Sequence, residues 1–118
     1  MVMTITIYHN PRCSKSRQTL ALLREHGVEP DIVEYLNTPP EAGELKRIID
    51  SLGLNPREVM RRKEAEYRDL RLDDESLSDS ALIEAMCRHP RLIERPIVIV
   101  GNQARIGRPP ESVLDILP

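Results

Sequence analysis

The sequence has no Trp or Phe and only three Tyr among its 118 residues. Single-stranded nucleic acids stack on aromatic side chains, so this scarcity disfavours that class of binding. The 17 Lys and Arg are outnumbered by 19 Asp and Glu, so the chain also lacks an overall basic charge. We therefore expect no nucleic-acid partner, and a core built from aliphatic side chains and Met.

Long apolar runs and paired cysteines are missing as well. No stretch approaches the roughly 18 apolar residues of a membrane-spanning helix, and the first ten residues lack the basic and apolar regions of a secretory signal. Two cysteines, Cys13 and Cys87, are too few for the disulfide framework of a small secreted domain. In a reducing compartment both would remain thiols. We expect a cytoplasmic protein without membrane association, folded as a single domain over residues 1–118.

The first third of the chain has the pattern of a βαβ unit. Residues 4–8 and 31–36 have the composition of strands. Between them, a helix is predicted to begin at Ser14 and to be closed by Gly27. Strands joined by such a crossover helix are expected to be parallel.

The middle of the chain, about residues 40–90, is predicted to be helical throughout. Apolar residues recur there at helical spacing, and cap residues separate the helices. The predicted helices are 41–52, one that starts at the cap Asn55, runs through Met60 and carries Arg61 and Arg62, one over 64–72 with Tyr67 and Leu70 inward, and one from Ser78 to His89.

The last part of the chain is predicted to be a hairpin and a short helix. The strands are 97–100 and 103–106, joined by a Gly-Asn turn, and the helix opens at Pro110 with Val113, Leu114 and Leu117 inward. The order βαβ, helices, ββα is typical of an α/β thioredoxin-like fold with a helical insertion between its halves.

Cys13 lies at the predicted start of the first helix, in the segment YHNPRCSKSR. A thiol reacts as its thiolate, which is favoured by a helix N-terminus and by nearby His9, Arg12, Lys15 and Arg17. The same N–H groups can bind an oxyanion. We therefore predict that Cys13 is a nucleophile in an oxyanion site. The alternative, a small residue filling the turn, is less favoured because this polar setting is poorly suited to burial.

The other cysteine and the histidines are interpreted as structural. His9 and Cys13 could join Cys87, His26 or His89 around a metal, but no paired ligand spacing supports a zinc site, so no metal is predicted. His26 and His89 have the positions of helix-end residues. Cys87 is interpreted as a small core or groove residue, with an internal disulfide to Cys13 as the alternative.

Several motifs together resemble a known family. YHNPRCSKSR, LLREHGVEPDIVEYL, MRRK, ERPIVI and ARIGRP resemble, in that order, the arsenate reductase family that uses glutathione and glutaredoxin, most closely its short chromosomal members. The resemblance covers essentially the whole chain. It implies a thioredoxin-like fold with a helical insert, reduction of arsenate to arsenite, no bound cofactor, glutathione as co-substrate and glutaredoxin as partner.

The resemblance also implies roles for individual residues. Cys13 would attack arsenate, and the adduct would be resolved by glutathione and then by glutaredoxin. Arg61, Arg95 and Arg108 would hold the oxyanion, although a one-residue shift in helix phase would exchange Arg61 for Arg62. A cis bond is expected between Arg95 and Pro96. The residues expected to support the thiolate are His9, Asn10, Ser16 and Arg17.

Two alternatives remain open on the sequence. The chain is also similar in fold to the Spx-type regulators, which bind RNA polymerase and sense oxidation through a C-x-x-C pair, but here Ser16 holds the second position. The second alternative is a glutaredoxin-like enzyme that acts on glutathione mixed disulfides through Cys13 alone. Ser14 and Lys15 follow the nucleophile where the resistance enzymes have small residues, so another oxyanion is also considered as substrate.

Overall fold

The computed structural model describes residues 4–118. Two compact units are present: the first comprises the chain up to Thr38 together with Arg95–Pro118, and the second is Pro39–Glu94. The second unit coincides with the segment predicted as a helical insertion. Within residues 4–118, no helix is long and apolar enough to cross a membrane.

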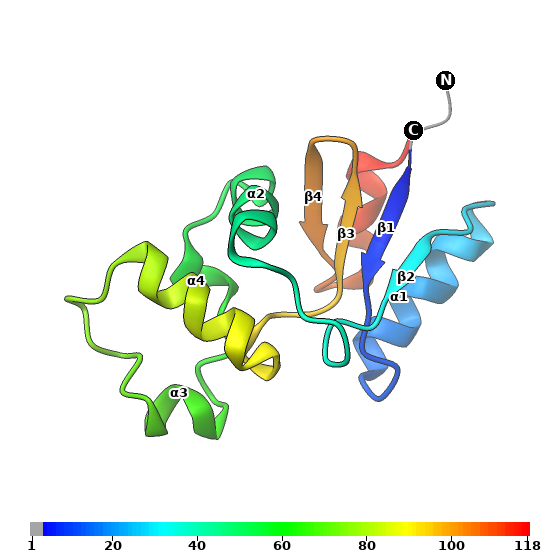
Figure 1. The fold of residues 1–118 in the computed structure, drawn as a ribbon. Helices are drawn as coiled ribbons and strands as arrows, with labels where there is room; N and C mark the ends of the chain where they lie inside the picture. Colours follow the sequence, from blue (N-terminus) through cyan, green and yellow to red (C-terminus); the bar gives the residue numbers. More distant parts are fainter. Residues whose placement is uncertain (1–3) are drawn as a thin grey trace. The chain divides into compact units, whose positions relative to one another are not determined.

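The first unit is built on a four-stranded sheet (Figure 1). Its strands are β1 (Ile5–Tyr8), β2 (Asp31–Val33), β3 (Ile97–Val100) and β4 (Gln103–Ile106), in the spatial order β2-β1-β3-β4. β1 is parallel to β2, while β3 is antiparallel to both β1 and β4. Helix α1 (Ser14–Glu25) connects β1 to β2. The predicted βαβ and ββα halves and the thioredoxin-like class are therefore confirmed.

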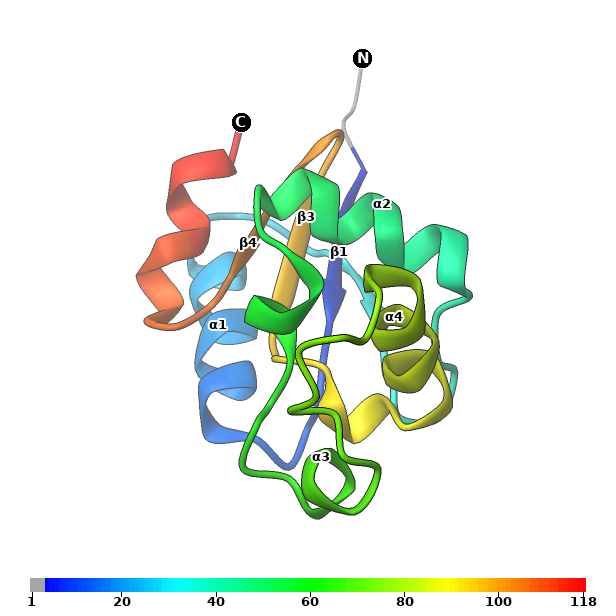
Figure 2. The same cartoon turned by 90° about the vertical axis from the view of Figure 1, so that its left-hand side faces the viewer.

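One face of this sheet is covered by α1 and by the 3₁₀ helix η3 (Pro110–Ile116), which lie side by side (Figure 2). Apolar side chains from the sheet and from both helices form one core cluster. Burying each such side chain contributes about 1.5–3 kcal/mol to folding. The cluster consists of Ile7, Leu20, Leu23, Val98, Val100, Val113 and Ile116.

The final helix differs from the prediction in its period. It is a 3₁₀ helix with three residues per turn, so positions three apart share one face. Pro110, Val113 and Ile116 are accordingly its buried residues. Val113 is therefore inward as predicted. The prediction of Leu114 as inward assumed the α-helical period, and Leu114 is only partly buried, whereas Leu117, the C-cap residue, is partly buried and packs against the core cluster.

The second strand is shorter than predicted. β2 ends at Val33 instead of reaching residue 36. The Glu34 carbonyl accepts the N–H groups of Asn37 (2.9 Å) and Thr38 (3.1 Å), which closes a turn. Tyr35 is buried in this turn and stacks on Tyr8, with ring centroids 6.4 Å apart. The segment 34–36, which was predicted as part of the strand, is therefore a turn whose apolar side chain Tyr35 is buried.

The second unit is a cluster of short helices. They are α2 (Ala42–Leu52), η1 (Pro56–Val59), α3 (Ala65–Asp69), α4 (Asp79–Arg88) and η2 (Pro90–Leu92). The predicted ends of α2 and α4 are confirmed. Gly53 closes α2 in the left-handed conformation, and the Ser78 hydroxyl accepts the Ala81 N–H (3.1 Å) at the start of α4.

The helix predicted from Asn55 ends earlier than expected. Asn55 and Glu58 form the predicted capping box, but Met60 has an extended backbone and forms an antiparallel bridge with Ile93. The Arg61 N–H then donates to the Leu92 carbonyl (2.7 Å). The prediction that Arg61 and Arg62 lie on this helix was wrong, because the bridge between Met60 and Ile93, 33 positions away, overrides local helix preference.

The prediction for Leu70 was also wrong. Leu70 is 45% exposed, whereas Leu72 is buried. Arg71, with φ 55°, turns the chain in the left-handed region, and the Leu72 N–H donates to the Tyr67 carbonyl (2.9 Å). This turn directs Leu72 inward beside Tyr67, which is buried as predicted.

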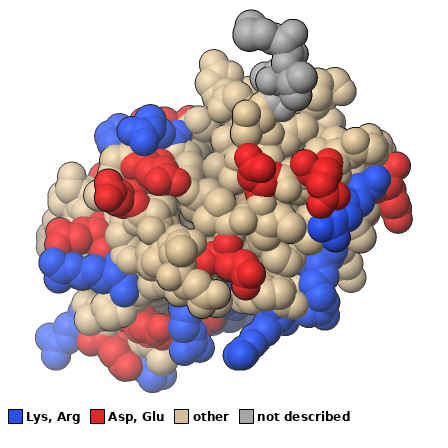
Figure 3. Space-filling model, turned by 45° about the vertical axis from the view of Figure 1, so that its right-hand side comes forward, with Lys and Arg blue, Asp and Glu red and all other residues tan. Residues whose placement is uncertain are grey.

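Charged side chains of both signs are interspersed on the face drawn in Figure 3. This distribution agrees with the small net charge of −2. An anion site in this chain must therefore depend on local placement of cations and not on an overall field.

Candidate functional site

The loop between β1 and α1 places Cys13 at the N-cap of α1. Its own N–H donates to the Asn10 carbonyl (3.0 Å), and its carbonyl accepts the Arg17 N–H (3.0 Å) as the helix begins. The side chain is only 9% exposed. The expectation that a cysteine in this polar segment would be poorly placed for burial was wrong, because the first turn of the helix and the arginine-bearing segments described below cover it.

The surroundings of Cys13 favour its thiolate. Burial, the largest single effect, raises the pKa of the thiol, whereas the backbone N–H of Ser16 and the charge of Arg95 lower it. The Lys15 N–H and the charge of Arg108 lower the pKa further, so that it lies below the ordinary cysteine value. The helix start thus acts as the anion site that its unpaired N–H groups predict.

Two arginines approach this sulfur from the β3–β4 hairpin. Arg95 precedes β3 and Arg108 follows β4, so the antiparallel hairpin brings both to the same end of the sheet. The Arg108 Nε–H donates to the Arg95 carbonyl (2.9 Å), and its Nη2 lies 3.8 Å from Cys13 Sγ. Arg108 is also exposed, so its guanidinium meets both the sulfur and the solvent from which an anion would arrive.

Both arginines precede a cis peptide bond. The bond between Arg95 and Pro96 is cis, as predicted, and so is the bond between Arg108 and Pro109. The second one was missed, since nothing in the local sequence distinguishes it from an ordinary turn.

His9 and Ser16 form a buried pair beside the cysteine loop. The His9 Nδ1 and the Ser16 hydroxyl are 2.6 Å apart, and the hydroxyl also accepts the Asn10 N–H (3.0 Å). Burial lowers the pKa of His9, and nearby arginines lower it further against the opposing charge of Glu34. His9 is thus kept neutral and ties the end of β1 to the first turn of α1.

The polar residues Asn10 and Arg17 also brace the loop. The Asn10 side-chain oxygen accepts the Arg12 N–H (3.0 Å), and the Arg17 Nη1–H donates to the Pro11 carbonyl (2.9 Å). These bonds hold the backbone between β1 and α1 in one conformation. The residues predicted to support the thiolate, His9, Asn10, Ser16 and Arg17, are all found around this loop.

The third predicted arginine lies in the second unit. Arg61 pairs there with Glu64 (2.5 Å) and Glu94 (3.6 Å), and it is about one quarter exposed. Arg62 is exposed. Of the two, Arg61 is held in a defined position, by carboxylates on either side of it.

Cys87 belongs to the second unit and is half-buried and free, as Cys13 is free. Burial raises the pKa of Cys87, and the neighbouring carboxylates of Glu44 and Glu84 raise it further. Its thiol is therefore a poorer nucleophile than that of Cys13. His26, at the end of α1, places Nδ1 3.0 Å from the Leu22 carbonyl, which confirms its predicted helix-end position.

No candidate metal centre was found among residues 4–118, where no three His, Cys, Asp or Glu side chains gather in a way that could hold an ion.

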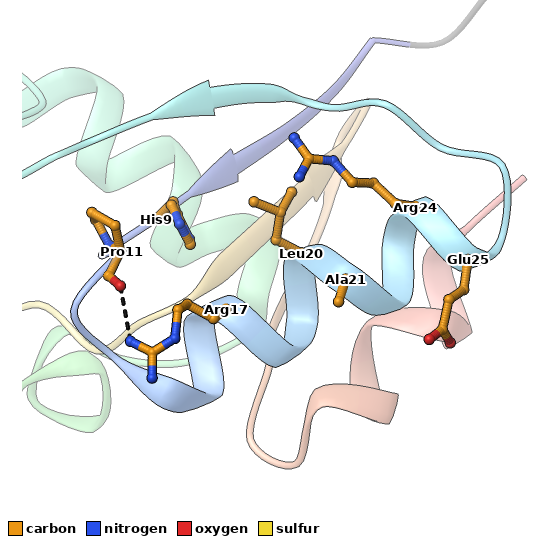
Figure 4. Close-up of a pocket in the computed structure, with 7 residues that line it drawn as sticks. All are labelled: His9, Pro11, Arg17, Leu20, Ala21, Arg24 and Glu25. Atoms are coloured by element: carbon orange, nitrogen blue, oxygen red, sulfur yellow. Dashed lines mark hydrogen bonds between the residues drawn. The ribbon is translucent and has the colours of Figure 1, made fainter.

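A shallow groove of about 680 Å³ runs along the outer face of α1 (Figure 4). Its floor is made by Leu20 and Ala21, and both of its arginines are engaged: Arg17 with the Pro11 carbonyl and Arg24 with Glu29 (2.9 Å). Cys13 does not line it. Both arginines of the groove thus have partners, whereas the Arg108 Nη2 lies 3.8 Å from Cys13 Sγ, so the arginines beside the sulfur make the better anion site.

Comparison with known proteins gives consistent results. A model of the ArsC family matches residues 8–116. An uncharacterized protein of Escherichia coli K12, YfgD, is 57% identical over 118 residues, which cover 99% of each chain. An arsenate reductase of Haemophilus influenzae is 51% identical over 116 residues, 98% of this chain and 100% of the relative. The solved structure of an arsenate reductase from Vibrio cholerae has a TM-score of 0.96 at 57% identity and covers 99% of this chain and 100% of that one.

Proposed function

Because this chain belongs to the ArsC family, we propose that it is an arsenate reductase in which Cys13 is the nucleophile. The observation that carries the proposal is the placement of the Arg108 guanidinium 3.8 Å from the sulfur of a thiol whose pKa is lowered. A related oxyanion of the same shape and charge is the alternative substrate.

The cations beside Cys13 reduce the electrostatic repulsion that opposes this reaction. A thiolate must approach arsenate, which is itself an anion at neutral pH, so the two repel each other. Arg108 and Arg95 supply planar guanidinium groups that can each donate two hydrogen bonds to an oxyanion. The N–H groups of Ser16 and Lys15 at the start of α1 add donors that need no reorganisation.

The proposed chemistry balances with two thiols. The Cys13 thiolate forms a bond to As(V), and one arsenate oxygen leaves as water or hydroxide. Glutathione then displaces a second oxygen of the adduct as water or hydroxide and forms its own sulfur–arsenic bond. The glutaredoxin thiol attacks the glutathione sulfur, so that a mixed disulfide forms and the electron pair of the broken sulfur–arsenic bond reduces arsenic to As(III). Water then cleaves the bond between Cys13 and arsenic, which releases arsenite and restores the Cys13 thiol. Overall, arsenate takes up two electrons, two thiols are oxidised to a disulfide, and one oxygen ends as water. This reaction requires a reducing compartment with glutathione, which supports a cytoplasmic location.

Arg61 is proposed as the third oxyanion ligand. Arg61 forms ion pairs with the carboxylates of Glu64 and Glu94, which leaves part of its five-donor guanidinium available for an anion. Arg62 is exposed, with no such fixed geometry, so Arg61 is the better of the two candidates.

The proposal is tested by arsenate-dependent NADPH oxidation in a mixture of glutathione, glutathione reductase and glutaredoxin. The native chain should turn over, Cys13→Ser should have no activity above the blank, and Arg95→Ala and Arg61→Ala should be strongly impaired. Arg68→Ala serves as the matched control, because Arg68 is a highly exposed arginine of the second unit that pairs only with its neighbour Asp69.

Two further assays separate the alternatives. Removal of glutathione from a glutathionylated peptide, without any arsenate turnover, would replace the proposal with a glutaredoxin-like activity. Capture of RNA polymerase by the native chain, again without arsenate turnover, would favour a Spx-type regulator. Ser16 weakens the latter hypothesis, since it is buried against His9 where such regulators carry their second cysteine.

A further inference from the structure

Gly107 lies at a contact between three segments of the first unit. A Cβ atom added there would lie 2.5 Å from Thr19 Oγ1 and 2.8 Å from Pro96 Cγ, well inside ordinary packing distances. The Gly107 N–H donates to the Pro96 carbonyl (2.9 Å). Glycine is therefore required here by the close approach of neighbouring side chains.

The groups that face Gly107 have little freedom to move away. Thr19 is fully buried in α1, its β-branched side chain is stiff, and its hydroxyl donates to the Lys15 carbonyl (2.8 Å). Pro96 is buried at the entry to β3. A larger residue at position 107 must displace its own segment, or the helix, or the entry to β3.

Each of the three segments carries one component of the site. Arg108 directly follows Gly107, Arg95 directly precedes Pro96, and Cys13 lies one and a half turns before Thr19 at the start of α1. Arg108 joins the three segments: its Nη2 lies 3.8 Å from Cys13 Sγ, and its Nε–H donates to the Arg95 carbonyl.

We infer that Gly107 and Thr19 are positioning residues, whose close contact sets how near Arg108 comes to the Cys13 sulfur. The part of this inference that concerns arsenate rests on the proposed function. The part that concerns the reactivity of the thiol does not, because it depends only on the distance between a cation and a sulfur.

The test is Gly107→Ala, read out first by the rate at which iodoacetamide alkylates Cys13 at a pH below the midpoint of the native alkylation profile, in a Cys87→Ser background. The rate should fall by up to about five-fold, the factor expected for loss of one cation near 4 Å from a thiolate in water. Gly43→Ala is the matched control: Gly43 lies in α2, where a new Cβ meets nothing nearer than Arg47 Nη1 at 3.8 Å, so the rate should not change.

Rescue distinguishes a positioning role from general damage to the fold. Adding Thr19→Ala to Gly107→Ala removes both Thr19 atoms that a Cβ at position 107 would meet but leaves the contact with Pro96 Cγ, so the alkylation rate should recover part of the way toward the native value. If Gly107→Ala alone does not fold, Thr19→Val replaces the hydroxyl that faces Gly107 with a larger methyl group. It should lower the rate in the same direction by a smaller factor.

The arsenate assay gives the second readout. Gly107→Ala should raise KM for arsenate more than it lowers kcat, because Arg108 binds the anion before any bond forms. A Gly107→Ala chain with native alkylation rate and native KM would overturn the inference, as would a double variant that stays as slow as the single one. If Gly107→Ala slows alkylation and the added Thr19→Ala partly restores it, but the native chain does not turn over arsenate, the positioning role stands and the proposed function fails.

Discussion

Removal of the Arg108 guanidinium should measurably weaken the thiolate of Cys13. The Nη2 atom lies 3.8 Å from Sγ, and two unit charges at that distance attract each other by about 1 kcal/mol in water. The aqueous value applies because Arg108 is exposed. Since about 1.4 kcal/mol corresponds to a factor of ten, Arg108→Ala should lower the thiolate population several-fold at a pH below the thiol pKa.

The assay is alkylation of Cys13 by iodoacetamide as a function of pH, again with Cys87→Ser to leave one thiol. In Arg108→Ala the midpoint should move to higher pH, whereas Arg108→Lys should keep part of the charge effect but lose the planar donor pair. Arg68→Ala controls for the loss of one exposed positive charge that does not belong to the first unit. A midpoint that is the same in Arg108→Ala and in the native chain would refute the electrostatic role of this arginine.

Three further predictions concern stability. Ser16→Ala should lower the free energy of unfolding by about 1–3 kcal/mol in urea, because the His9 ring and a backbone N–H lose their buried partner. Asn55→Ala should cost about 1 kcal/mol in the same experiment, through loss of the capping box with Glu58. Because the pKa of Cys13 is lower in the folded chain, the native chain should gain stability over Cys13→Ser as pH rises through the folded pKa, with the full gain above the unfolded pKa near 8.5.

Each of these has an outcome that would contradict it. Ser14→Ala, at an exposed position of the same helix, should cost far less than Ser16→Ala, so equal effects would argue against the buried pair. An Asn55→Ala chain as stable as the native one would show that η1 does not depend on its cap. A stability difference between native and Cys13→Ser that is constant from pH 5 to 10 would mean that folding does not lower the thiol pKa.

The elements that were predicted well are those whose signals are local. The strand residues before Cys13, the helix that starts at Ser14 and the IVIV–QARI hairpin each carry their own period and stop residues, and all three were found. Placing Cys13 at a helix N-terminus required only this local pattern. The position of Arg95 before a cis bond came from the family resemblance, not from the local residues.

The features that were missed depend on contacts between distant segments. Met60 leaves the helical conformation because it pairs with Ile93, and no local signal distinguishes it from a helix residue. The close approach of Gly107 to Thr19 joins residues 88 positions apart, so the sequence shows only a glycine in a turn. The buried bond between His9 and Ser16 could have been anticipated, since His9 directly follows β1, Ser16 lies in the first turn of α1, and the short turn at Pro11 and Arg12 joins the two elements.

The central claim, that arsenate reacts at Cys13, is tested most directly by a single-turnover experiment without glutaredoxin. The native chain is incubated with glutathione, with and without arsenate, and peptide mass spectrometry then locates any adduct. The account predicts a glutathione-containing adduct on the peptide of Cys13 that forms only when arsenate is present and that is absent in Cys13→Ser. An adduct that forms equally well without arsenate, or none at Cys13 under either condition, would contradict it.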